Sequence, residues 1–180
     1  MVKIKHFLYI TFILMSSLLV LYSFKQNNTD VDMNLPEYNP VEKYPNCLKM
    51  YYAIEKYSKI YNIPKNFAYG IAYNETGYKH PFQWGYNHKQ ISSSGALGPM
   101  QVLLSTAKWV WNDNTITKEK MLNDIDFNIE TSMKYLNLLH KQYREWKIVF
   151  GYYNTGYPQV NSYAIYASNT KNYKSKWIKL

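Results

Sequence analysis

The sequence predicts a mainly α-helical domain that lies behind an N-terminal membrane anchor helix. Two features lead to this fold class. From Cys47 onward, apolar residues recur at helical spacing, and signals for strands are weak throughout. Ahead of them, residues 7–24 contain no charged side chain. We therefore expect a transmembrane anchor or signal sequence over residues 1–25, a linker over residues 26–45 and one helical domain over residues 46–180.

The uncharged run near the N-terminus is about long enough to cross a bilayer as a helix, which takes roughly 20 residues. Lys3 and Lys5 precede it, and such a positive flank predicts a cytoplasmic N-terminus. No Ala-x-Ala-like site follows the run, which favours an uncleaved anchor over a cleaved signal peptide. In either case we expect the helical domain outside the cytoplasm, in the periplasm or facing the cell wall, and secreted if the segment is cleaved.

The first two helices of the domain are indicated by their end signals. A periodic run from Cys47 should continue to about Asn62, shortly before Pro64 breaks it. Pro64 fits the first turn of a second helix. Gly77 is a natural C-cap for that helix, which therefore carries Glu75 at its end.

A long loop is predicted over residues 78–94, and long loops in compact domains are usually functional or disordered. Its aromatic side chains favour a functional role; they are Tyr78, Phe82, Trp84 and Tyr86.

Four helices are expected after this loop. On the longest of them, His140 is interpreted as a core histidine because it falls on the apolar stripe. The helices are a short one through Trp109 and Trp111 capped by Ser105 or Thr106, a longer one capped by Asp126 with the stripe Ile129, Met133, Leu136, His140 and Tyr143, one from Trp146 to Asn154 closed by Gly156, and one from Val160 to Ala167.

A compact turn is predicted at Gly95, Gly98 and Pro99, because a regular helix could not hold these residues. Such a turn can present the side chains of Ser92 and Gln101 toward a ligand. Phosphate is not favoured as that ligand, since the Gly-Lys-Ser/Thr ending of a phosphate-binding loop is absent.

Charge and composition narrow the class of partner. The net charge is +9 and the pI is about 9.3, so the partner is expected to be polyanionic: nucleic acid, a membrane surface or an acidic wall polymer. The basic residues are scattered, which disfavours nucleic acid. The 20 tyrosines and 5 tryptophans offer flat faces that stack on sugars or bases, although most tyrosines are expected in the core.

No metal and no other cofactor is expected. The single cysteine, Cys47, excludes an internal disulfide and any cysteine-based metal site. His80 and His88 lie in a loop without cysteine or a nearby second carboxylate, which is not a ligand signature.

Glu75 is the strongest candidate for a catalytic residue. It is the only acidic residue between Lys56 and Asn112, and it lies at the end of an apolar helix with aromatic residues following. Such a site raises the pKa of a carboxyl group, as a general acid requires. The alternative is a solvated glutamate in a last helical turn.

Four segments, in order, resemble the lytic transglycosylases of the soluble-transglycosylase (SLT) type, which are relatives of goose-type lysozyme. The match runs from about Cys47 to Ala167, and four segments in the same order are far more specific than one. The segments are Asn74-Glu75-Thr76-Gly77 for the family's Glu-Ser-Gly, Ser92 through Gln101 for Ser-x-x-Gly-Ala-x-Gly-Leu-Met-Gln, Asn128 to Tyr135 and on to Leu139 for Asn-x-x-x-Gly-x-x-Tyr-Leu, and Gly151 through Gly156 for Ala-Tyr-Asn-Ala-Gly.

The resemblance implies a small lysozyme-like fold with a groove, and roles for the matching residues. Glu75 would be the catalytic acid and then the base. The enzyme would cleave the β-1,4 bond between N-acetylmuramic acid and N-acetylglucosamine of peptidoglycan and leave 1,6-anhydromuramic ends. The other implied site residues bind substrate or support the site: Ser92 and Gln101 on the sugar and its N-acetyl group, Met100 lining the groove, Tyr153 orienting Glu75, and Asn154 supporting that turn.

The segments depart from the family pattern at Thr76, Pro99, Ser132 and Thr155, none of which removes a group expected to do chemistry. Most glycosidases use two carboxyl groups, and Glu75 stands alone among the four segments. The C6 hydroxyl of the muramic acid would supply the nucleophile instead. A second carboxylate would have to come from the linker and long-helix region, where the candidates are Asp113, Glu119, Asp124 and Asp126.

Two alternatives stay open. One is a goose-lysozyme-like muramidase, which uses the same acid and water. The other is a non-catalytic peptidoglycan-binding module. The expected partners are peptidoglycan strands and, through the N-terminal segment, the cytoplasmic membrane; an envelope-spanning secretion or conjugation apparatus is also compatible.

Overall fold

The computed structural model describes residues 44–168, and the predicted anchor, most of the predicted linker and residues 169–180 lie outside the described residues. Within residues 44–168 all regular structure is helical, apart from two isolated bridges, Ile91–Leu97 and Leu97–Val102. No helix in this range is both long and apolar enough to span a membrane. The helices are α2 (Asn46–Ile60), α3 (Lys65–Thr76), α4 (Leu104–Trp111), α5 (Lys118–Asn123), α6 (Ile125–Tyr143), α7 (Trp146–Thr155) and α8 (Ser162–Ser168).

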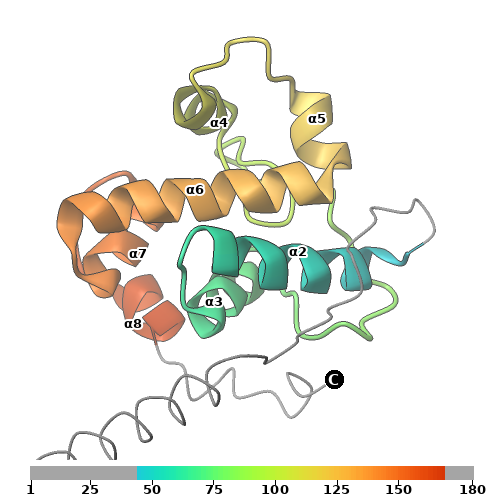
Figure 1. Ribbon diagram of the computed structural model, residues 1–180, viewed down its shortest axis with the longest axis horizontal. Coiled ribbons are helices and arrows are strands. Elements are labelled where there is room, and N and C mark those ends of the chain that lie inside the picture. Colours follow the sequence, from blue (N-terminus) through green and yellow to red (C-terminus); the bar gives the residue numbers. More distant parts are fainter. Residues whose placement is uncertain (1–43, 169–180) are drawn as a thin grey trace, which may run out of the picture. The chain divides into compact units, whose positions relative to one another are not determined.

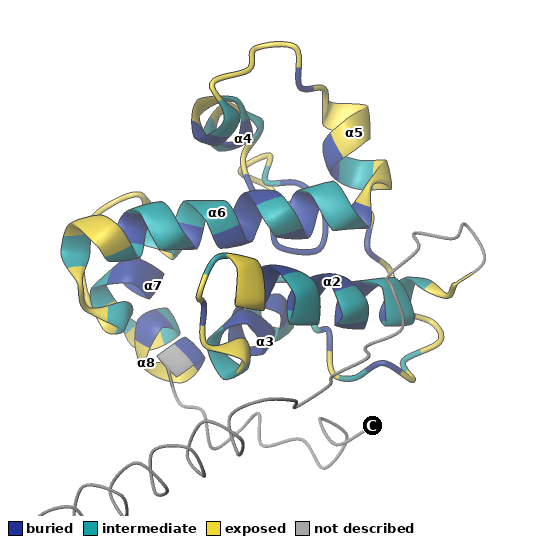
Figure 2. Ribbon diagram, viewed as in Figure 1, coloured by how far each residue is buried: buried dark blue, intermediate teal, exposed yellow. Residues whose placement is uncertain are grey.

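Helix α6 is the central element. It contacts α2 and α7 as well as α4 and α5, and α4 and α5 lie on the side of α6 opposite α2 and α3 (Figure 1). Its predicted stripe is confirmed over Ile129, Met133 and Leu136, which are fully buried. Buried residues run along α6 and α2, whereas the loop between α4 and α5 is mostly exposed (Figure 2).

The start of α6 differs from the prediction. Asp124, and not Asp126, caps the helix by accepting a hydrogen bond from the Phe127 backbone N–H. Asp126 lies in the first turn, where it accepts a hydrogen bond from the Tyr57 hydroxyl. Lys56 Nζ lies 3.6 Å from the same carboxylate. Asp126 therefore ties α6 to α2, a long-range contact that local cap signals do not reveal.

Two other local predictions were wrong, and one helix was not predicted. His140 is not a core histidine: it is partly exposed and stacks on Trp146, with ring centroids 4.1 Å apart. Helix α4 begins at Leu104 without a side-chain cap, so neither Ser105 nor Thr106 has the predicted role. Helix α5 was not predicted, although Thr117 caps it by accepting from the Lys120 N–H.

The ends of α3 and α7 follow the prediction. Gly77 and Gly156 both adopt left-handed conformations, with φ of 69° and 77°, which glycine tolerates at a helix C-cap. Glu75 therefore stands in the last turn of α3.

After Gly156 the chain folds back onto α7. A Cβ atom on Gly151 would lie 1.7 Å from the backbone oxygen of Gln159, so only glycine permits this close approach. The return segment leads into α8, which contacts both α7 and α3. This path brings α8 to the helix that carries Glu75.

Candidate active site

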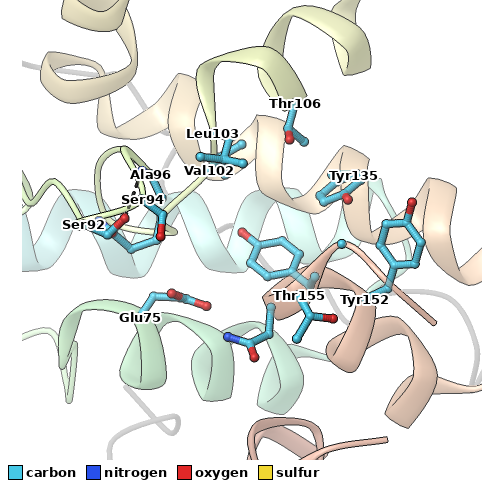
Figure 3. Close-up of a pocket in the computed structure, with 14 residues that line it drawn as sticks. Glu75, Ser92, Ser94, Ala96, Val102, Leu103, Thr106, Tyr135, Tyr152 and Thr155 are labelled. Atoms are coloured by element: carbon cyan, nitrogen blue, oxygen red, sulfur yellow. Dashed lines mark hydrogen bonds between the residues drawn. The ribbon is translucent and has the colours of Figure 1, made fainter. Parts of the chain in front are cut away.

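A cavity of about 440 Å³ lies at the end of α3. Glu75 projects into it from α3, and Ser92 and Ser94 lie on the opposite side (Figure 3). Helices α6 and α7 supply tyrosines to the cavity. The described lining residues are Glu75, Ser92, Ser94, Ala96, Gln101, Val102, Leu103, Thr106, Tyr135, Tyr152, Tyr153, Asn154, Thr155 and Gly156.

Glu75 has the electrostatic character that the sequence predicts. Burial raises the pKa of its carboxyl group to about 7, against an ordinary value of 4.5. A hydrogen bond from the Tyr163 hydroxyl, 2.5 Å from Oε1, acts in the opposite direction and lowers that pKa. Among the described lining residues Glu75 is the only carboxylate. The described lining of the cavity thus holds one carboxyl group, whose pKa burial raises toward neutrality.

The loop that faces Glu75 is held by Asn128 on α6, which is fully buried. Its Oδ1 accepts from the Met100 N–H at 3.1 Å, and its Nδ2 donates to the backbone oxygens of Leu97 (2.9 Å) and Met121 (3.0 Å). A Cβ atom on Gly98 would lie 2.5 Å from Asn128 Nδ2, and Gly98 has φ of 73°. The glycine therefore allows the turn to lie directly on the asparagine.

The Transglycosylase SLT domain family model matches residues 52–176. The chain belongs to this family. Comparison with curated protein sequences gives no match. Solved structures with the same fold include an inactive mutant of the lytic transglycosylase Slt from Pseudomonas aeruginosa, at 17% identity and a TM-score of 0.51, covering 68% of this chain and 23% of that one.

Two further similar structures are of the 70 kDa soluble lytic transglycosylase. That of the Escherichia coli protein is 23% identical with a TM-score of 0.50, covering 67% of this chain and 19% of that one. A complex of the 70 kDa soluble lytic transglycosylase with bulgecin A is 24% identical with a TM-score of 0.50, covering 66% of this chain and 18% of that one. The chain thus spans less than a quarter of the length of these proteins, and at these identities the likeness concerns the fold.

The predicted site residues of this SLT domain gather at the cavity, with one exception. Ser92, Gln101 and Asn154 line it together with Glu75. Met100 does not line it: its side chain is fully buried, and only its backbone takes part in the loop's hydrogen bonds. The prediction that Met100 lines the groove is therefore wrong for its side chain.

Ser92 and Gln101 also stabilise the loop itself. Ser92 Oγ accepts from the Ala96 N–H at 3.0 Å. Gln101 adopts a positive φ of 49°, and its Nε2 donates to the backbone oxygens of Gln90 (3.1 Å) and Gly98 (2.8 Å). These bonds fix the two polar side chains at the cavity wall before any ligand binds.

Tyr153 lines the cavity together with Glu75, and its hydroxyl bonds the loop that faces Glu75. Its hydroxyl donates to the Met100 backbone oxygen at 2.7 Å and lies 2.9 Å from Ser132 Oγ. Burial, and secondarily the charge of Glu75, raise the pKa of this phenol well above its ordinary value. Tyr153 therefore supports the loop as a neutral phenol, and the hydrogen bond to Glu75 comes from Tyr163.

The four departures from the family pattern all have hydrogen-bond partners. Thr76 Oγ1 donates to the Pro99 backbone oxygen at 2.8 Å, so two of the departures meet in one bond between α3 and the loop. Ser132 bonds Tyr153, as described above. Thr155 Oγ1 accepts from Gln159 Nε2 at 2.9 Å and so helps to hold the return segment against α7.

Sequence reasoning missed three tyrosines of the site. Tyr163 follows the last matched segment by a few residues, and the only available signal was a tyrosine in a short helix after Gly156. Tyr135 and Tyr152 line the cavity from α6 and α7.

The aromatic residues of the 78–94 loop do not line the cavity, contrary to the role that their number suggested. Tyr78 and Tyr86 are buried in the core, and Phe82 and Trp84 are exposed. Within residues 44–168 no group of three or more His, Cys, Asp or Glu side chains could hold a metal ion.

Proposed function

We propose that this chain is a peptidoglycan lytic transglycosylase, which cleaves the β-1,4 bond between N-acetylmuramic acid and N-acetylglucosamine and leaves 1,6-anhydromuramic ends. One observation carries the proposal: a single buried carboxyl group, Glu75, lies in the cavity with its pKa raised to about 7. Membership of the SLT family supports the same substrate class.

Glu75 is suited to act first as an acid and then as a base. With its pKa near 7, a large share of the carboxyl groups carries a proton at neutral pH, ready for transfer to the glycosidic oxygen as the bond to the anomeric carbon breaks. The resulting carboxylate accepts the proton of the muramic acid C6 hydroxyl, whose oxygen bonds to the same anomeric carbon. Glu75 ends in its starting state, and no water is consumed.

Attack by the substrate's own hydroxyl explains why one carboxylate suffices. Retaining glycosidases place two carboxyl groups about 5–5.5 Å apart, and inverting enzymes about 6.5–9.5 Å apart. An oriented intramolecular nucleophile supplies roughly 7–11 kcal/mol without such a partner. None of the candidates for a second carboxylate lines the cavity. Three of them have hydrogen bonds elsewhere: Asp113 accepts from Thr115, Asp124 caps α6, and Asp126 accepts from Tyr57.

Tyr163 supports the second half of this cycle. Its hydroxyl is bonded to Glu75 Oε1 and stabilises the carboxylate that forms when the proton leaves. Burial favours the acid and Tyr163 favours the base, and a pKa near neutrality serves both steps.

We also propose that residues 1–25 anchor the domain in the cytoplasmic membrane, with the domain on the periplasmic or wall-facing side and residues 26–45 as a linker. The support is the uncharged run of residues 7–24 behind Lys3 and Lys5. A net charge of +9 suits an envelope rich in acidic polymers. A secretion or conjugation apparatus that must cross the wall is a partner compatible with this location.

Digestion of purified sacculi in heavy-oxygen water tests the proposed reaction. Mass spectrometry should find 1,6-anhydromuramic ends that carry no label, because no water oxygen enters the product. Labelled reducing ends as the main product would instead favour a muramidase with Glu75 still the acid. The matched control is Glu75→Gln, which should lose about 10²–10⁴-fold of the rate because an amide cannot donate and retrieve a proton. Binding without turnover by the wild-type protein would favour a binding module.

A further inference from the structure

The loop of residues 78–94 presents two large aromatic rings to solvent. Phe82 is 45% and Trp84 is 65% exposed, and their ring centroids lie 6.1 Å apart. Exposed apolar groups that lie together often mark a surface that binds another protein or a membrane. Neither ring lines the cavity at Glu75, so the proposed reaction gives this pair no role.

The conformation of this loop is fixed from within. Tyr78 and Tyr86, on either side of the exposed pair in the sequence, are buried and meet edge to face with ring centroids 5.2 Å apart. Between them, Gln83 Nε2 donates to the Gly77 backbone oxygen at 3.2 Å. A partner that binds the exposed pair therefore has little loop motion to arrest, which lowers the cost of binding.

Positive charge accompanies the aromatic pair. Lys79 and Lys89 are exposed on the same loop, and residues 76–111 contain no acidic side chain. Lys49 of α2 adds to this charge: burial, followed by the charges of Lys89 and Lys49, lowers the pKa of His88 in the loop. Tryptophan at the level of the lipid headgroups and lysine beside acidic lipids are the side chains that favour a membrane surface.

The loop lies at the end of the domain that the predicted linker enters. The Tyr78 hydroxyl donates to the Cys47 backbone oxygen at 2.9 Å, which ties the loop to the first turn of α2 (Figure 1). The predicted linker, residues 26–45, ends directly before that turn. A linker of this length spans no more than about 70 Å even when fully extended, so a membrane-anchored domain keeps this loop within reach of the bilayer.

We propose that the loop of residues 78–94 docks on the outer face of the cytoplasmic membrane, with its exposed aromatic pair among the lipid headgroups and its two lysines beside acidic lipids. The proposal rests on the proposed membrane location and is independent of the proposed reaction. Ser92 of the same loop lines the cavity, so docking sets the height and orientation of Glu75 above the bilayer. It confines cleavage to glycan strands that lie close to the membrane.

The test measures how close Trp84 comes to lipid in the full chain, reconstituted in vesicles whose acyl chains carry bromine near the headgroup. Bromine quenches tryptophan fluorescence only at short range, and the predicted anchor contains no tryptophan. In vesicles that contain phosphatidylglycerol, we expect Trp84→Ala to remove most of the quenching. Lys79→Gln combined with Lys89→Gln should weaken the quenching in the same vesicles, because the attraction to acidic lipid is reduced.

The matched control is Trp109→Ala. This indole is 63% exposed, but it lies on α4, on the side of α6 opposite α2 and α3 (Figure 1). Its removal should leave the quenching unchanged. Equal quenching in wild type and Trp84→Ala would overturn the docking. A loss of affinity for purified sacculi in Trp84→Ala, without a loss of quenching, would assign the aromatic pair to the wall and also overturn it.

Flotation of the vesicles on a density gradient and cleavage of sacculi are measured alongside. A chain that does not float with its lipid would refute the membrane location together with the docking. A chain that floats without quenching at Trp84 would refute the docking alone. Trp84→Ala should cleave purified sacculi at the wild-type rate, and quenching at Trp84 in a chain that cleaves no sacculi would refute the reaction while the docking stands.

Discussion

The hydroxyl of Tyr163 donates a hydrogen bond of 2.5 Å to Glu75 Oε1, although 88 residues separate the two in the chain. Tyr163 comes from α8, and Glu75 from the last turn of α3. The bond stabilises the carboxylate against burial, which alone would raise the pKa of Glu75 further. The working pKa of the acid is thus set jointly by two distant parts of the chain.

Tyr163→Phe should therefore raise the pKa of Glu75, because the group that lowers it is gone. The alkaline limb of the kcat/KM profile, where the free enzyme loses its acid, should move to higher pH. The plateau of kcat should fall roughly tenfold, since hydrogen bonds to charged groups contribute about 1.5–3 kcal/mol. Kinetics over a range of pH would measure both effects.

Tyr153→Phe is the matched control for this experiment. It removes the same atom from a tyrosine that bonds Met100 and not Glu75. It should lower the midpoint of denaturation while the alkaline limb stays in place. A limb that moves with Tyr153→Phe, or stays with Tyr163→Phe, would show that the hydrogen bond is assigned to the wrong tyrosine.

Glu75→Gln should stabilise the folded protein at alkaline pH. The folded-state pKa of Glu75 is raised from 4.5 to about 7, so its contribution to stability is fully present below pH 4.5 and is lost as the pH rises through 7. A shift of this size corresponds to about 3 kcal/mol. Glutamine stays neutral and avoids this loss. The variant should accordingly gain up to about 3 kcal/mol over wild type between pH 4.5 and pH 8.

Urea denaturation of both proteins across this pH range measures the difference in their free energies of unfolding. The contributions of the other titrating groups are the same in both proteins and cancel in this difference. Glu119→Gln, on the exposed face of α5, provides the baseline for losing one carboxylate. A stability difference between Glu75→Gln and wild type that did not change with pH would mean that Glu75 is not buried in solution.

Local signals explain what the sequence could predict. Gly77 and Gly156 end their helices by a preference of the backbone itself, and the position of Glu75 follows from Gly77. The stripe Ile129, Met133 and Leu136 is a property of one helix.

Long-range contacts explain what the sequence could not predict. Asp124 and Asp126 both suit a helix start, but Asp124 caps α6 whereas Asp126 accepts a hydrogen bond from the Tyr57 hydroxyl on α2. Met100 is buried in the core, where its backbone N–H donates to the side chain of Asn128 on α6. Tyr163 reaches Glu75 only because the return segment packs on α7.

Asn128→Ala should destabilise the protein by about 3 kcal/mol, because it removes three buried hydrogen bonds, to the Met100 N–H and to the Leu97 and Met121 carbonyls, at about 1 kcal/mol each. The Leu97 carbonyl keeps its bond from the Val102 N–H. Hydrogen exchange at the Met100 amide should quicken, and activity should fall as the loop carrying Ser92 and Gln101 loosens. Asn137→Ala on the same helix removes one bond, to the Tyr61 backbone oxygen, and should cost about 1 kcal/mol with activity retained. Similar losses for both variants would contradict a special role for Asn128.

Gly151→Ala should harm the site although Gly151 touches neither Glu75 nor the cavity. Alanine favours a helix over glycine by roughly 0.5–1 kcal/mol, but its Cβ would lie 1.7 Å from the Gln159 backbone oxygen. Overpacking of this kind costs about 1–3 kcal/mol, so the clash outweighs the propensity. The return segment must shift and carry α8 with it, which weakens the bond from Tyr163 to Glu75. Stability should therefore fall, and the alkaline limb of kcat/KM should move to higher pH as it does in Tyr163→Phe.

Gly85→Ala is the control, since a Cβ there meets nothing within 4 Å. If Gly151→Ala raised the melting temperature and left the pH profile unchanged, the return segment would not hold Tyr163 on the acid.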